Sequence, residues 1–147
     1  MISYQKGKKI TSCTAKGSTF YFVMTKNVVG YHGKRQCWFT RSSWAEIEIE
    51  IEKNWSNGKV ITGICYNQGL KQYLVVMTES AADQSYRCFK YSEFSEQSKW
   101  EDKEYDEKDR HPTIYFLDPN NHQLLIVYTS DENRSTYTAW PWFSLQC

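Results

Sequence analysis

The sequence predicts a mainly β fold built from three copies of a unit of about 50 residues. Short apolar segments recur in the same order along the chain. The tripeptide KIT at 9–11 returns as VIT at 60–62, and FVMT at 22–25 returns as VVMT at 75–78 and as IVYT at 126–129. These segments are rich in β-branched and aromatic residues, which favour strands. We therefore expect each copy to contribute two or three antiparallel strands and a connector.

The length of 147 residues fits a single repeat domain spanning 1–147, with approximate repeats 4–54, 55–104 and 105–147. Hydrophobic residues make up 40% and aromatic residues 16% of the chain, enough for a packed core. One unit of this size cannot bury its own apolar face, so the copies are expected to pack against one another.

Strands are predicted at the recurring segments and at a second run that follows each of them. Residues 73–77 are apolar throughout, which indicates a central strand buried on both faces, whereas 85–91 indicates a half-exposed strand. Turn residues precede or join strands at 56–58, 67–69 and 118–121. The second runs, in which apolar residues alternate after a polar loop, lie at 36–39, 84–89 and 134–137.

A connector closes the first two copies, and its aromatic ends form the predicted repeat framework. Trp44 and Trp55 are eleven residues apart, as are Phe94 and Tyr105. Residues 44–52 alternate as a strand would, but their bulky residues also fall at helical spacing. The second connector does not alternate, which favours a helix in both.

Three copies leave two ways to complete the fold. Closed β-propellers usually have four to eight blades, so two chains with three propeller-like blades each could close a six-bladed ring. Alternatively, one chain could form a self-contained pseudo-threefold β-trefoil.

Charge is segregated, although the net charge is only +1. Residues 1–45 carry eight basic and no acidic side chains, and the rest of the chain is acidic overall. A basic stretch interleaved with aromatics could bind single-stranded nucleic acid. It could equally face the acidic connector of a neighbouring repeat or chain. The candidate ligand-binding residues are Tyr31, Lys34, Arg35, Trp38 and Arg41.

The motifs that mark an enzyme or a metal site are missing from the sequence. The five cysteines form no CxxC pair, and the three histidines show no metal-ligand spacing. Neither a GxSxG elbow nor a GxGxxG fingerprint occurs. We therefore expect no enzymatic activity, no catalytic residues, no cofactor and no metal.

The succession of Trp55, Gly58, Ile61 and Thr62, followed by VMT at 76–78 and QSY at 84–86, resembles a repeat in the C-terminal region of plant casein-kinase-1-like protein kinases. The first copy matches with a tyrosine in place of the tryptophan, and the third departs further. The resemblance implies a propeller-like, non-catalytic repeat region with a role in interactions. It includes no kinase domain and supplies no catalytic residues.

Together these features predict a non-catalytic interaction module that self-associates through blade edges and complementary charge, giving a homo-oligomer or binding another protein. A single-stranded nucleic-acid binder is the alternative, and a carbohydrate-binding lectin comes third. The sequence carries no signal peptide and no apolar run long enough to cross a membrane, so we expect a cytoplasmic or nuclear protein that does not bind membranes.

Overall fold

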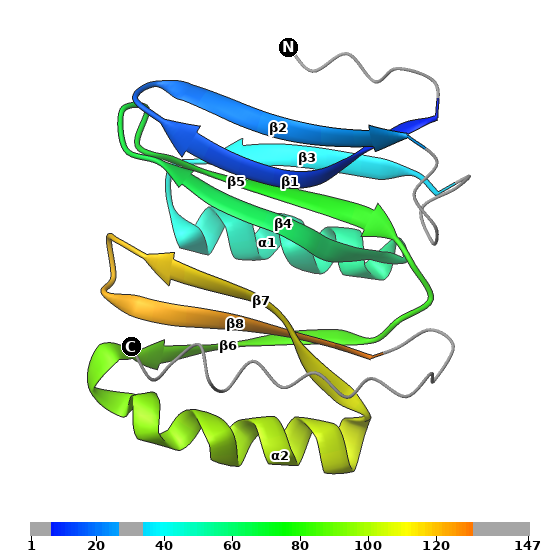
Figure 1. Cartoon of the computed structure of the whole chain (residues 1–147), viewed down its shortest axis with the longest axis vertical. Helices are drawn as coiled ribbons and strands as arrows, with labels where there is room; N and C mark the ends of the chain where they lie inside the picture. The colour runs from blue at the N-terminus through cyan, green and yellow to red at the C-terminus, as the bar shows by residue number, and fades with distance from the viewer. Residues whose placement is uncertain (1–6, 27–33, 131–147) are drawn as a thin grey trace. The chain divides into compact units, whose positions relative to one another are not determined.

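The computed structural model describes residues 7–26 and 34–130 of the chain (Figure 1). The chain divides into two compact units, Met1–Ala81 and Ala82–Cys147. All strands of the described residues lie in open antiparallel sheets of two or three strands. The predicted mainly β class is confirmed.

The first unit contains two sheets and one helix. The first sheet is the hairpin β1-β2, and the second sheet has the strand order β3-β5-β4, with α1 packed against it. The elements are β1 (Lys8–Lys16), β2 (Thr19–Lys26), β3 (Gln36–Arg41), α1 (Trp44–Ser56), β4 (Lys59–Asn67) and β5 (Gln72–Glu79).

The second unit contains the third sheet, whose strand order is β6-β8-β7, and a helix that contacts β7. The elements are β6 (Gln84–Lys90), the 3-10 helix η1 (Tyr91–Glu96), α2 (Gln97–Lys108), β7 (Arg110–Asp118) and β8 (Gln123–Ser130). Neither α1 nor α2 is long and apolar enough to cross a membrane, and no other helix of the described residues is.

Each three-stranded sheet combines a hairpin with the strand that precedes it in the chain. β3 pairs with β5, the second strand of the following hairpin, and β6 pairs with β8 in the same way. The first residue of each preceding strand lies opposite a threonine: Gln36 opposite Thr78, and Gln84 opposite Thr129. Each glutamine side-chain amide donates to that hydroxyl, at 3.0 Å and 2.9 Å. The two sheets therefore share one pairing register.

The same irregularity recurs in all three hairpins. The register shifts at Thr11, Thr62 and Thr113, each in the first strand of its hairpin, as in a β-bulge. Each of these hydroxyls lies within hydrogen-bond distance of a threonine on the second strand. The pairs are Thr11 with Thr25 (2.9 Å), Thr62 with Thr78 (2.8 Å) and Thr113 with Thr129 (2.8 Å).

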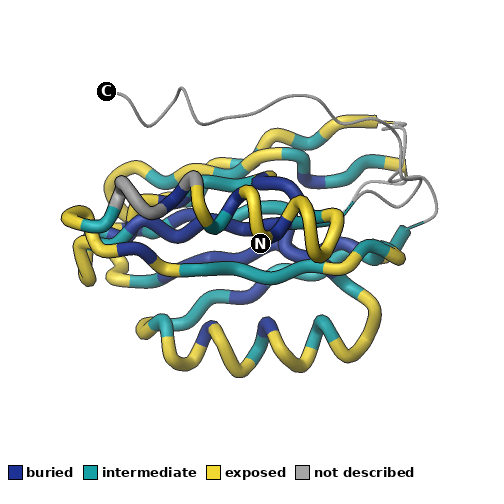
Figure 2. The backbone as a smooth tube through the Cα atoms, turned by 90° about the horizontal axis from the view of Figure 1, so that it is seen from below, coloured by how far each residue is buried: buried dark blue, intermediate teal, exposed yellow. Residues whose placement is uncertain are grey.

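Both connectors are helical, as the sequence favoured. Ser43 caps α1 and forms a capping box with Glu46, which fixes the start of the helix. Ile47 and Ile51 are fully buried, whereas Ile49 is 68% exposed, as the helical period requires. Buried positions recur at intervals among the described residues of both helices, which are otherwise exposed or intermediate (Figure 2).

The core of the first unit lies between its two sheets. Ile10 of β1 packs with Cys65, Leu74 and Val76 of the second sheet. The prediction of a central strand at 73–77 is confirmed, because β5 lies between β3 and β4 and residues 73–78 are buried. Of the predicted turns, 56–58 leads from α1 into β4, whereas 67–69 and 118–121 join strands. Asn67 Oδ1 accepts from the Leu70 amide at 2.9 Å where β4 leads to β5.

Candidate interaction surface

The first hairpin lacks a neighbour that the two later hairpins have. β5 and β8, the second strands of those hairpins, each lie between two strands. β2 is the second strand of the first hairpin and pairs with β1 alone among the described residues. Within residues 7–26 and 34–130, no strand pairs with the backbone amides and carbonyls along the other side of β2, and such an edge can accept another strand.

One face of β2 is exposed where the matching face of β5 and β8 is buried. Val23 is 58% exposed, whereas its counterparts in the repeated segment, Val76 and Val127, are 1% and 0% exposed. Two residues earlier in each strand, Tyr21 is 53% exposed, whereas Leu74 and Leu125 are 1% and 2% exposed. Apolar side chains thus occupy positions on β2 that the other two sheets bury.

The opposite face of the hairpin is firmly held. Phe20, Phe22 and Met24 pack against the core between the first and second sheets. Gln36 of β3 adds two hydrogen bonds to the backbone of Ile10, donating to its carbonyl at 3.0 Å and accepting from its amide at 2.9 Å. Because side chains alternate along a strand, Tyr21 and Val23 point away from this core. We call Tyr21, Val23 and the free side of β2 the open edge.

Among the predicted ligand-binding residues, the two arginines each lie close to a carboxylate of the first unit. Arg35 Nε lies 3.3 Å from Glu79 Oε2, and Arg41 Nη2 lies 3.0 Å from Glu50 Oε1 in α1. Trp38 packs against the core between the first two sheets. Lys34 is half-buried just before β3, and Tyr31 lies outside the described residues. Both arginines thus meet carboxylates that follow them in the sequence, and the tryptophan ring is partly withdrawn from solvent.

The predicted framework residues mark the helices but differ in burial. Trp44 begins α1, and its ring meets Tyr73 edge-on at 5.5 Å between centroids. Trp55 lies half-buried in the last turn of α1, and Tyr105 on α2 is 41% exposed. Phe94 lies in η1, and its side chain is outside the described part of the structure.

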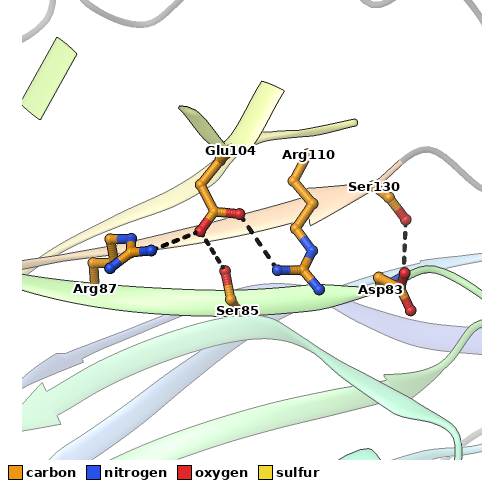
Figure 3. A network of polar contacts seen from close by, with 6 residues as sticks. All are labelled: Asp83, Ser85, Arg87, Glu104, Arg110 and Ser130. Atoms are coloured by element: carbon orange, nitrogen blue, oxygen red, sulfur yellow. Dashed lines mark hydrogen bonds and ion pairs between the residues drawn. The ribbon is translucent and has the colours of Figure 1, made fainter. Parts of the chain in front are cut away.

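A polar cluster joins α2 to the third sheet (Figure 3). Glu104 is 4% exposed and accepts hydrogen bonds from Ser85, Arg87 and Arg110, each at 3.3 Å. The Arg87 guanidinium also stacks over the Trp100 ring, 3.8 Å from its centroid. The carboxylate is therefore compensated by two cations, as a buried charge requires.

Glu101 lies one turn before Glu104 in a more apolar setting. Burial raises the pKa of this carboxyl, although hydrogen bonds from Tyr115 Oη, at 2.9 Å, and from Gln97 favour its charged form. The same burial and the Glu101 hydrogen bond raise the pKa of Tyr115. The three side chains form a helix-to-sheet contact in the second unit.

The sequence analysis does not predict this cluster, because residues 101–109 contribute there only to the acidic charge of the later part of the chain. The helical spacing of Gln97, Glu101 and Glu104, at steps of four and three, could have indicated a polar helix face turned inward. Their partners are up to 19 residues away in the chain, so no local motif marked them.

The described cysteines are free thiols, of which Cys65 is buried, Cys13 and Cys37 are half-buried and Cys88 is exposed. The hydrogen bond with Cys13, together with burial, raises the pKa of the Cys65 thiol, and the same bond lowers the pKa of Cys13. Cys37 donates to Asn54 Oδ1 at 3.4 Å, and burial raises its pKa. Within residues 7–26 and 34–130, no group of three His, Cys, Asp or Glu side chains is arranged to hold a metal ion.

Comparison with known proteins finds no family model, no curated protein and no solved structure that matches this chain.

Proposed function

We propose that this chain is a non-catalytic interaction module that self-associates through the open edge. One observation carries the proposal: β5 and β8 each pair with a strand on both sides, whereas β2 has a partner on one side only within the described residues. An unpaired strand edge is a template for another strand.

The burial pattern supports the same conclusion. Tyr21 and Val23 present apolar area to solvent at positions whose counterparts are covered in the other two sheets. Removing such area from water contributes about 25 cal/mol per Å². Covering the open edge would therefore stabilise the complex over the separate chains.

Complementary charge supports association between unlike parts of two copies. Residues 1–45 are basic and later segments are acidic. Opposite charges on unlike segments favour head-to-tail contact over contact between like surfaces.

Light scattering at several concentrations, in low and high salt, tests the proposal. We expect the wild type to reach twice 17.4 kDa and to dissociate more readily in high salt. Tyr21→Lys combined with Val23→Lys places two cations on the open edge and should shift the midpoint of association at least tenfold in concentration. Both side chains are more than half exposed, so the isolated chain should fold as before.

The matched control is Leu117→Lys, which changes a 61% exposed apolar residue on β7. It should leave the mass unchanged. A wild type that stays at 17.4 kDa at every concentration refutes the proposal, as does a control that dissociates the assembly as strongly as the double variant.

A further inference from the structure

The order of strands in the two three-stranded sheets indicates which kind of segment could pair with the open edge. In both three-stranded sheets, the third strand follows one hairpin in the chain and pairs with the next. β3 follows β2 and pairs with β5, and β6 follows β5 and pairs with β8. The first hairpin is the one that the described residues leave without such a strand.

The sequence holds a third segment of the same type. Residues 134–137 occupy the place after β8 that 36–39 and 84–89 occupy after the earlier hairpins. They belong to the stretch RSTYTA at 134–139, in which threonine and tyrosine favour strands. This stretch lies outside the described residues and therefore enters the argument through its sequence alone.

We propose that the occupant of the open edge is the segment 134–139 of a second copy of this chain, added antiparallel to β2 as a third strand. The inference rests on the proposed function and names its partner. A second copy is favoured over the same chain because closed propellers usually have four to eight blades, whereas the described residues of one chain form three hairpins. Two copies, each donating one strand and receiving one, make a closed twofold assembly.

The shared register predicts which residues meet. Gln36 lies opposite Thr78 and Gln84 opposite Thr129, so the first residue of the donated segment should lie opposite Thr25. Thr25 is the threonine of β2 that corresponds to Thr78 and Thr129, and its hydroxyl bonds to Thr11. Counting along antiparallel strands then places Thr136 opposite Val23.

A complementation experiment separates donor from receiver. The receiver-blocked variant carries Tyr21→Lys and Val23→Lys; the donor-blocked variant carries Thr136→Pro and Tyr137→Pro. Adjacent prolines remove two successive backbone donors, at least one of which faces the partner strand. Each variant alone should associate at least tenfold more weakly than the wild type. An equimolar mixture should form dimers again, as measured by light scattering. The donor-blocked variant keeps an intact β2, and the receiver-blocked variant keeps an intact segment 134–139.

The outcomes distinguish this inference from the proposed function. A donor-blocked variant that dimerises like the wild type overturns the inference and leaves self-association through β2 standing, since two β2 edges could then pair with each other. A mixture that stays as monomeric as its components also overturns it. A monomeric wild type overturns both.

Cross-linking tests the register and does not depend on the lysine variants. Chains carrying Val23→Cys are mixed with chains carrying Thr136→Cys, since directly opposed residues approach closely enough for a disulfide. After mild oxidation, we expect at least fivefold more covalent dimer than with wild-type chains, which control for the native thiols. Leu117→Cys replaces Val23→Cys in the matched control. Equal yields from the two mixtures refute the register.

Discussion

The isoleucines of α1 allow the fold to be tested at a point where the sequence was ambiguous. In a strand, Ile47, Ile49 and Ile51 would share one face, whereas in the helix Ile49 lies on the opposite side. Ile47 and Ile51 are 0% exposed and Ile49 is 68% exposed. Truncating each in turn to alanine therefore reports directly on which periodicity the segment adopts.

The expected cost follows from burial. Isoleucine to alanine removes three carbons, worth about 0.8 kcal/mol each when buried, or roughly 2.4 kcal/mol. The cavity left behind raises the total, and typical values for buried isoleucine are about 2–5 kcal/mol. Alanine's better helix propensity returns a few tenths of a kcal/mol. We expect Ile47→Ala and Ile51→Ala each to cost about 2–4 kcal/mol, and Ile49→Ala to change stability by less than about 0.5 kcal/mol.

Urea unfolding followed by circular dichroism measures these differences from the midpoints at constant slope. Ile49→Ala is the internal control, because it deletes the same atoms from the same helix. If Ile49→Ala costs as much as Ile47→Ala, the segment does not bury one helical face, and the assignment of α1 is wrong.

Two further predictions concern the second unit. Glu104→Gln keeps the volume of the side chain but removes the charge that compensates Arg87 and Arg110. We expect this change to lower the free energy of unfolding, measured by urea titration, by about 2 kcal/mol. A loss below about 0.5 kcal/mol would contradict a structural role for the carboxylate. Burial raises the pKa of Glu101 above 4.5, so the folded chain holds that proton more tightly than the unfolded chain. This stabilisation is complete below the ordinary pKa and is lost as the pH rises through the folded-state pKa. Relative to Glu101→Gln, the wild type should therefore lose stability from pH 4.5 toward neutrality, and parallel curves would refute this.

The open edge combines features that only the coordinates bring together. Val23, Val76 and Val127 occupy equivalent places in the repeated segment, and nothing in their local sequence separates them. Val76 packs against Ile10 and the β1-β2 hairpin in the core between the first two sheets, whereas Val23 lies on the face of β2 that points away from that core. Sequence similarity thus identified the positions, and the packing of each face distinguished Val23 from Val76.

For the candidate ligand-binding residues, the sequence did not predict which partners they contact. Their charge and aromatic character suggested a shared surface, but strand alternation turns Trp38 toward the first sheet. Arg41 ends β3, which brings it to Glu50 of the helix that follows. Composition could not predict these contacts, because they depend on the crossing of α1 over β3.

By itself, the sequence determined the mainly β class, the order and spacing of the strands, the turns and the buried central strand at 73–77, because these follow from local periodicity and turn chemistry. The tertiary structure decided that the third strand of each three-stranded sheet comes from the preceding segment, that α2 turns Glu101 and Glu104 inward, and that β2 pairs on one side only within the described residues. Those features depend on contacts between residues far apart in the chain, whose energies no local pattern encodes.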